Sequence, residues 1–298
     1  MQHHRGIWLF TGFFVLVAAI ILAVRDARAP ARAPVIDTPV KVVASELSER
    51  QIEMLVVTMK ACLENDPQAR RANTRSLVDG VAALAADGIY ETADTYYALG
   101  VLRTAQLDFP GAEAAYQKAV ELRPDWNWVY NGLGILKHTQ GQYAEAEAAF
   151  RKAIELDPSW SRAHNDLAIL LRLTGCLEDA EVHALRALEL NPDAVATHNN
   201  YGNLLVALER YDEAEAEYRA AIAHEPDHPA PYYNLACLAS LRGDREEVVP
   251  LLLCAIEFDA SYRDEAKFDE DFDAVRDDPA FRLLVQGTNG ERMTRLPE

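Results

Sequence analysis

The chain has 298 residues, half of them hydrophobic, and a formal net charge of -18 from 29 Lys and Arg against 47 Asp and Glu. So acidic a chain repels phosphate backbones, which argues against nucleic acid as a direct partner and favours a solvated acidic surface. Its four cysteines, Cys62, Cys176, Cys237 and Cys254, form no C-x-x-C motif. The sequence therefore indicates no zinc ribbon and no thioredoxin-like site, and it leaves open whether the cysteines pair.

Residues 1–24 form the first predicted element, a membrane anchor. The stretch Gly6–Val24 has 19 residues and no charge. As a helix it would span roughly 28 Å, which matches a bilayer core. The alternative is a cleaved signal peptide, whose apolar region is usually shorter, about 7–15 residues. The length thus favours an uncleaved single-pass helix that crosses the lipid bilayer with residues 6–24.

Residues 25–42 are rich in Pro, Ala and Arg and have no helical period, so we expect an extended linker. Its three arginines outnumber Arg5 on the other side of the span. The positive-inside rule therefore favours a cytoplasmic body over a periplasmic one. Residues 43–92 read as helices that are either an N-terminal cap or a degenerate repeat.

A 34-residue period follows, marked by Pro124, Pro158, Pro192 and Pro226. It divides residues 93–262 into five repeats, 93–126, 127–160, 161–194, 195–228 and 229–262. Three columns hold small residues: Gly100, Gly134, Ala168, Gly202 and Ala236 in the eighth; Ala112, Ala146, Ala180, Ala214 and Val248 in the twentieth; Ala119, Ala153, Ala187, Ala221 and Ala255 in the twenty-seventh. Large residues interleave with them, including Tyr116, Phe150 and Tyr218 in the twenty-fourth column.

This pattern predicts that each repeat is a helical hairpin. Apolar residues recur at helical spacing in two runs per repeat, and Gly141, Gly175 and Gly243 fall between the runs, where the chain must turn. Each proline ends the second helix because it lacks an N–H and restricts the residue before it. Pro250 lies inside the second run of the fifth repeat, where we expect a kink. One hairpin cannot bury its own apolar face, so stacking is expected.

The stretch YNGLGILKHTQGQYAEAEAAFRKAIELDP, from Tyr130 to Pro158, resembles the tetratricopeptide repeat family. The resemblance covers residues 93–262 and implies an all-α superhelical solenoid of hairpins. It departs in the third repeat, which has His164 and Ala184 at positions that are usually large or aromatic. The fifth repeat, with Val248 and Ala260, departs further.

The five letters HEPDH, from His224 to His228, fit the H-E-x-x-H zinc motif. The repeat places Pro226 at a helix end, so we expect the two histidines to straddle a turn, where they cannot hold zinc as that motif does. His164 and His198 share one column and invite a metal pair, but we expect structural histidines packed between the helices of a repeat. Without a phosphate loop or a nucleophile motif, the sequence predicts no enzyme, no cofactor and no metal site.

In this family the first helices of the repeats line a concave groove, which implies a partner-binding surface. The implied residues are Tyr97, Trp128, Asn131, Arg162, Asn165, Arg172, Asn199, Asn203 and Tyr233. An asparagine row can bond an extended peptide backbone, the arginines can hold a carboxylate, and the aromatic residues are apolar anchors. The alternative is that the asparagines bond to neighbouring repeats.

Residues 263–298 resemble the acidic closing module and tail that follow such repeats. The run DEDFD, from Asp269 to Asp273, begins like a calcium loop, but it lacks the glycine and the final glutamate that such a loop needs. We expect five apolar residues to cover the open end of the stack: Phe268, Phe272, Val275, Phe281 and Leu284.

These features together predict a membrane-anchored, noncatalytic scaffold that binds other proteins or peptides. Two alternatives stay open on the sequence. One is an assembly factor of the bacterial cell envelope or of cytochromes. The other is a noncatalytic regulatory subunit of a membrane enzyme.

Overall fold

The computed structural model describes residues 93–286. The predicted anchor at 1–24, the linker at 25–42, the helices at 43–92 and the tail from residue 287 lie outside the described residues. Within 93–286, no helix has both the length and the apolar character needed to cross a membrane.

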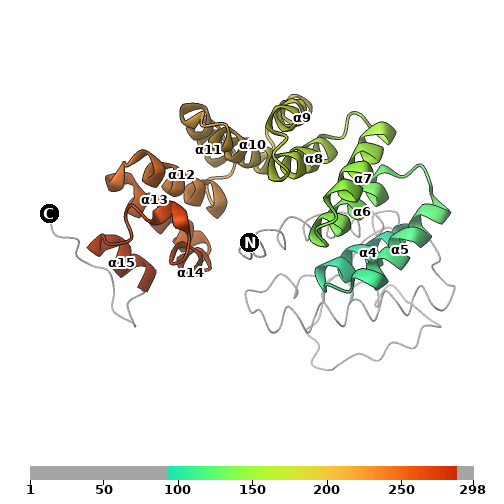
Figure 1. The fold of residues 1–298 in the computed structure, drawn as a ribbon, viewed down its shortest axis with the longest axis horizontal. Coiled ribbons are helices and arrows are strands. Elements are labelled where there is room, and N and C mark those ends of the chain that lie inside the picture. Colours follow the sequence, from blue (N-terminus) through green and yellow to red (C-terminus); the bar gives the residue numbers. More distant parts are fainter. Residues whose placement is uncertain (1–92, 287–298) are drawn as a thin grey trace, which may run out of the picture. The chain divides into compact units, whose positions relative to one another are not determined.

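The described residues are helical throughout and form hairpins of two helices lying side by side (Figure 1). Hairpins 1 to 5 consist, in order, of α4 (Ala93–Ala105) and α5 (Phe109–Leu122), α6 (Asn127–Thr139) and α7 (Tyr143–Leu156), α8 (Ser161–Leu173) and α9 (Leu177–Leu190), α10 (Val195–Ala207) and α11 (Tyr211–His224), and α12 (Pro229–Arg242) and α13 (Arg245–Phe258). A C-terminal cap follows, made of α14 (Tyr262–Ala266), the short 3-10 helix η1 (Glu270–Phe272) and α15 (Pro279–Gln286).

The chain divides into two compact units at the boundary between Pro158 and Ser159. Among the described residues, the first unit holds hairpins 1 and 2, and the second holds hairpins 3 to 5 and the cap. The boundary falls two residues before the end of the second predicted repeat, between α7 and α8.

The small-residue columns are the places where the two helices of a hairpin meet. Every residue of the twentieth and twenty-seventh columns has no exposed surface, from Ala112 in hairpin 1 to Ala255 in hairpin 5. In the eighth column, a methyl group added to Gly134 would lie 2.5 Å from the ring of Phe150. The small residues are therefore required by close helix approach, as the sequence predicted.

The prolines of the repeat end the second helices, which confirms the prediction from the sequence. Each second helix of hairpins 1 to 4 stops two residues before its proline. The residue before Pro158, Asp157, has φ -144° and ψ 89°, an extended conformation that proline imposes on its predecessor. Pro250 behaves differently, because α13 runs through it without ending.

The cap covers the end of hairpin 5, as expected, but not with all the residues expected. Phe272, Val275, Phe281 and Leu284 are buried in one cluster with α12 and α13. Phe268 is 75% exposed, so its predicted place in the cover is wrong. The reason lies in the turn after α14, where Arg276 Nη2 donates to the Asp269 carbonyl oxygen at 2.7 Å and Arg276 Nη1 donates to that of Lys267. These bonds fix the backbone on both sides of Phe268.

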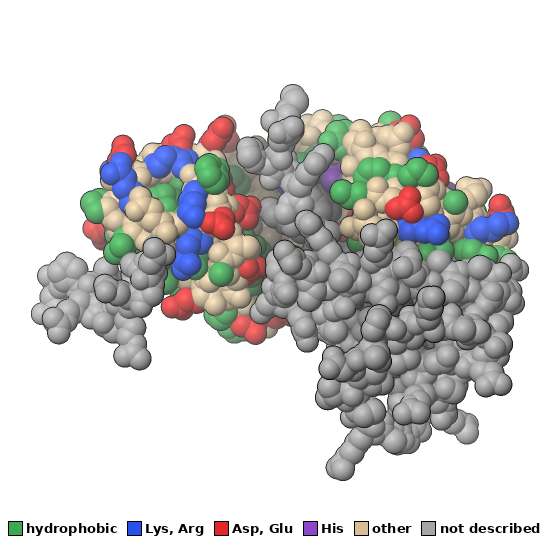
Figure 2. All heavy atoms as spheres, turned by 90° about the horizontal axis from the view of Figure 1, so that it is seen from below, with side chains coloured by type: hydrophobic (Ala, Val, Ile, Leu, Met, Phe, Trp, Pro, Cys, Tyr) green, Lys and Arg blue, Asp and Glu red, His purple; other side chains and the backbone are tan. Residues whose placement is uncertain are grey.

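Acidic and basic side chains are mixed on the face of the described residues that Figure 2 shows, where Lys and Arg lie among Asp and Glu. Several ion pairs join neighbouring hairpins. Arg210 Nη1 lies 2.5 Å from Glu181 Oε1, and Arg242 Nη1 lies 2.6 Å from Glu215 Oε2. The charged side chains of the visible face thus form a solvated surface, with ion pairs that join neighbouring repeats.

Candidate peptide-binding face

The second, fifth, ninth and twelfth columns of the repeat run along the first helices, and in the second unit these are α8, α10 and α12. We call the surface made by these columns the first-helix face. It includes Arg162, Asn165, Ile169 and Arg172 on α8, Ala196, Asn199 and Asn203 on α10, and Tyr233 and Cys237 on α12. The helices α8 and α10, and α10 and α12, are in contact, so these residues form one continuous strip.

Two asparagines of the predicted row bond to the next repeat. Asn200 Nδ2 donates to Asn165 Oδ1 at 3.2 Å, and Asn234 Nδ2 donates to Asn199 Oδ1 at 2.8 Å. Asn165 is buried, and its own amide nitrogen lies 3.4 Å from Asp166 Oδ1. Asn165 thus serves the packing of the repeats, whereas Asn199 is half-buried and keeps its NH₂ group for other acceptors.

The sequence reasoning missed Asn200 and Asn234, the sixth-column residues that donate in these bonds. A signal was present, because asparagine recurs 34 residues apart at both positions. The reasoning also missed Tyr218, whose hydroxyl donates to Asn203 Oδ1 at 2.7 Å. Asn203 is half-buried, so Tyr218 fixes the orientation of a side chain that also reaches the surface.

The two tyrosines of the predicted groove lie in cores. Tyr97 is 3% exposed, and its ring centroid lies 5.1 Å from that of Trp126 and 6.2 Å from that of Trp128. Tyr233 is 5% exposed, and its hydroxyl donates to Asp269 Oδ2 at 2.7 Å. Neither tyrosine offers much surface to a partner.

The remaining predicted groove residues differ in exposure. Asn131 is 3% exposed in the first unit, while Trp128 is half-buried. Arg162 and Arg172 are both half-buried on α8, but Arg162 Nε lies 3.5 Å from Asp166 Oδ2. Burial lowers the pKa of Arg172 from its ordinary value. The half-buried groove residues of the second unit are therefore Arg162, Arg172, Asn199 and Asn203.

The HEPDH segment is a turn, which confirms the expectation. His224 is the last residue of α11, and His228 is the N-cap of α12. The two side chains therefore belong to different helices and lack the single helical face that zinc binding by this motif requires. Burial lowers the pKa of His228, which favours its neutral form.

His198 has the structural role predicted for it. Its Nε2 lies 2.7 Å from the Pro192 carbonyl oxygen, and its Nδ1 lies 2.7 Å from Glu217 Oε2. Tyr130 and Tyr232 occupy the same column, and their hydroxyls donate to the carbonyl oxygens of Pro124 and Pro226. The column thus ties hairpins 2, 4 and 5 to the proline turn before each of them. His164 lies 3.0 Å from His183, Nδ1 to Nδ1.

The thiol of Cys237 and the carboxylates of Asp269 and Asp271 form another cluster, with their possible ligand atoms within 4.8 Å of one another. A metal would need the thiolate. Burial, and then the two aspartates, raise the pKa of the Cys237 thiol well above its usual value, which favours the protonated form. Asp269 Oδ2 already accepts from Tyr233 and lies 3.9 Å from Cys237 Sγ. The chemistry of this group favours internal hydrogen bonds.

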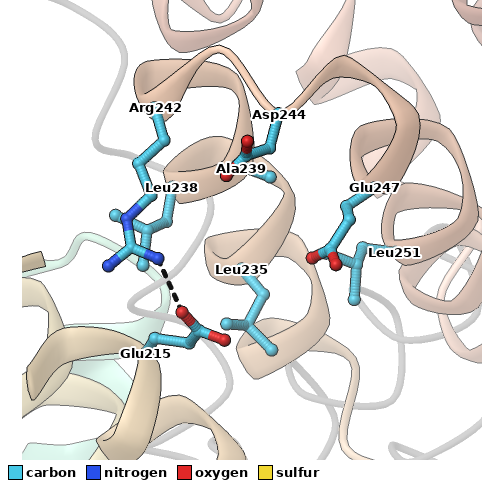
Figure 3. Close-up of a pocket in the computed structure, with 8 residues that line it drawn as sticks. All are labelled: Glu215, Leu235, Leu238, Ala239, Arg242, Asp244, Glu247 and Leu251. Carbon is cyan, nitrogen blue, oxygen red and sulfur yellow. Dashed lines mark hydrogen bonds and ion pairs between the residues drawn. The ribbon is translucent and has the colours of Figure 1, made fainter. Parts of the chain in front are cut away.

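A hollow between α11, α12 and α13 is lined by Glu215, Leu235, Leu238, Ala239, Arg242, Asp244, Glu247 and Leu251 (Figure 3). It measures about 230 Å³ including open solvent. The ion pair between Arg242 and Glu215 crosses it, so the hollow is part of the packing contact between hairpins 4 and 5.

Family models described as tetratricopeptide repeat match residues 91–159, 132–195 and 195–228. Their matches coincide with the hairpins from α4 to α11. These hairpins are tetratricopeptide repeats. The fifth predicted repeat lies beyond the matches, yet α12 and α13 bury its small columns in the same way.

Solved structures share this all-α solenoid fold. The thermophilic tetratricopeptide-repeat protein TTC0263 of Thermus thermophilus is 22% identical, with a TM-score of 0.53 over 58% of this chain and 96% of that one. PilF of Pseudomonas aeruginosa is 19% identical, with a TM-score of 0.52 over 72% of this chain and 97% of that one. The Cut9–Hcn1 structure is 14% identical, with a TM-score of 0.55 over 79% and 52%. No curated protein matches the chain.

Proposed function

We propose that this chain is a membrane-anchored, noncatalytic scaffold whose tetratricopeptide repeats hold a protein or peptide partner on the first-helix face. The observation that supports the proposal is the arrangement of two asparagine side chains on α10. Asn199 and Asn203 lie one helical turn apart, both are half-buried, and an internal donor fixes the carbonyl oxygen of each amide. Their NH₂ groups are thus set on one face, where they can donate to the carbonyl oxygens of an extended backbone.

The binding claim is tested by capturing native partners with the full chain and with the double variant Asn199→Ala, Asn203→Ala. Each hydrogen bond lost contributes roughly 0.5–1.5 kcal/mol, so partner affinity should fall about tenfold to hundredfold. Asn191→Ala is the matched control, since Asn191 is exposed at the end of α9, away from the first-helix face. Melting curves by circular dichroism show whether the variants stay folded. If the folded double variant captures partners as well as the unaltered chain does, the binding site lies elsewhere.

Anchoring is the second part of the proposal, and the uncharged stretch at residues 6–24 supports it. The full chain should stay in the membrane fraction through high-salt and alkaline washes, while a chain that lacks residues 1–40 should be released. A mature N-terminus near Pro30 would instead show cleavage and remove the anchor. Protease protection of the repeats would decide between the expected cytoplasmic side and the periplasmic side.

A further inference from the structure

Two histidines face each other across the two helices of hairpin 3. His164 lies on α8 and His183 on α9, and their Nδ1 atoms are 3.0 Å apart. Their ring centroids lie 5.2 Å apart, with the ring planes tilted by 32°. His164 is 7% exposed and His183 is half-buried, so the pair lies at the edge of the helix interface. The repeat columns suggested His198, one repeat away, as the partner of His164, whereas the structure supplies a partner within the same hairpin.

This arrangement is specific to hairpin 3 among the five described hairpins. Position 164 belongs to the fourth column of the repeat, which holds Tyr or His throughout, and position 183 belongs to the twenty-third. The other members of the twenty-third column are Ala115, Ala149, Glu217 and Leu251. In hairpin 4 the two columns set His198 against Glu217, a base against an acid. Hairpin 3 instead sets two imidazoles against each other, which are two possible metal ligands of the same kind.

A proton and a metal ion can each join two imidazole nitrogens at this spacing. In a hydrogen-bonded pair, one ring donates its Nδ1 proton and the other accepts it. Two nitrogens bound to one ion at about 2.0–2.1 Å lie about 2.9 Å apart at a right angle and about 3.4 Å apart at the tetrahedral angle. The observed 3.0 Å falls within that range, so ion binding requires a reorientation of the rings but no separation of the helices.

We propose that His164 and His183 bind a divalent transition-metal ion such as Zn²⁺ through their Nδ1 atoms. Imidazole nitrogen suits Zn²⁺, Cu²⁺ and Ni²⁺, whereas Mg²⁺ and Ca²⁺ take oxygen ligands. The ring that donates in the hydrogen-bonded pair shifts its proton from Nδ1 to Nε2, so both rings stay neutral and the site releases no proton. Water fills the remaining coordination positions.

The bound ion joins α8 to α9 and thereby stabilises hairpin 3, because it binds the folded chain and not the unfolded one. Neither histidine belongs to the columns of the first-helix face. The proposal is therefore independent of the proposed partner binding.

The test is isothermal titration of Zn²⁺ into the metal-free full chain in detergent, alongside three single variants. His183→Gln removes one ligand, and a side chain of this length fits the column because Glu217 holds the same place in hairpin 4. His224→Gln is the matched control, since His224 is an exposed histidine at the end of α11. Glu217→His gives hairpin 4 the same pair of imidazoles. His3 and His4 are present in every variant and contribute the same background.

We expect His183→Gln to weaken the binding of one zinc ion by about a hundredfold or more, since losing even a residue that supports a ligand costs about 10–100-fold. His224→Gln should bind zinc as the unaltered chain does, and Glu217→His should take up one further equivalent. Zinc should raise the melting temperature of the unaltered chain more than that of His183→Gln.

Equal zinc affinity of the unaltered chain and of His183→Gln would overturn the proposal. A loss of affinity confined to His224→Gln would also overturn it and would place the ion at the HEPDH segment. If His183→Gln does not fold, Glu217→His decides the question, because zinc uptake equal to that of the unaltered chain would show that these two columns do not form a metal site.

Discussion

At the scale of single residues, the turn between the two helices of each hairpin has one conformation in all five repeats. Gly141, Gly175 and Gly243 have φ between 76° and 84°, and Leu107 and Glu209 have φ of 62° and 60°. The sequence pointed to the three glycines but gave no sign of the other two, because any residue can be held in this region by the helices on either side. Non-glycine residues pay a steric penalty there.

Glu209→Gly should therefore stabilise the second unit by about 1 kcal/mol, because it removes the strain of a side chain at positive φ. Gly175→Ala should destabilise it by a similar amount, and no neighbouring atom lies within 4 Å to complicate the result. Urea denaturation followed by circular dichroism measures both. A loss of stability in Glu209→Gly would show that the Glu209 side chain contributes more than its backbone strain costs.

Glu265 in the cap gives a prediction about pH. Burial first, and then the charges of Asp269 and Asp259, raise the pKa of its carboxyl in the folded chain. The folded state then binds more protons than the unfolded state, so stability falls as pH rises from the ordinary glutamate pKa through the raised folded value.

Glu265→Gln removes this loss. The variant should be more stable than the parent chain at neutral pH and equally stable below about pH 4, where the glutamate is protonated in both states. Melting temperatures across this range measure the difference. A Gln variant that is less stable at neutral pH would show that the carboxylate makes a favourable contact in the cap.

At the scale of the hairpin, the eighth and twenty-fourth columns complement each other in size. Glycine faces an aromatic ring at Gly100 and Tyr116, at Gly134 and Phe150, and at Gly202 and Tyr218. Where the twenty-fourth column holds Ala184 or Leu252, the eighth holds Ala168 or Ala236. The sequence revealed both columns because the 34-residue period aligns them, but contact between them required the structure.

Gly134→Ala should destabilise the first unit by about 1 kcal/mol, since overpacking against Phe150 exceeds the gain in helix propensity. In a Phe150→Leu background the same substitution should become stabilising, because the smaller side chain leaves room and alanine is the better helix former. The sign of the change, measured by urea denaturation in both backgrounds, is the result. The same sign in both would show that the ring is not what excludes the methyl group.

The groove was harder to derive from sequence than the fold. Columns assign residues to a helical face, and this correctly brought Asn165, Asn199 and Tyr233 onto the first helices. They do not say which side chains the protein uses internally. Asn165 accepts a hydrogen bond from the next repeat, from a residue 35 positions later in the chain. Tyr233 donates to the cap, to a residue 36 positions later. Such contacts depend on how repeats stack, which no single repeat specifies.

At the scale of the whole molecule, the described part of the chain is a series of five helical hairpins, four of them matched by tetratricopeptide repeat models, followed by an acidic cap. The cap lays its extended Asp269 on the face that we propose for a partner, so one end of that face is already filled by the chain itself. A partner is then expected along α8 and α10, where half-buried polar side chains remain.

The most direct measurement is site-specific photo-crosslinking in cells that express the full chain. A photoreactive phenylalanine analogue replaces Ala196, which is exposed on α10, or Val182, which is 65% exposed on the second helix α9. Both positions accept a large side chain, so only the face differs. The account predicts that a partner crosslinks from position 196 and not from position 182. Crosslinks from position 182 with none from position 196 would contradict it.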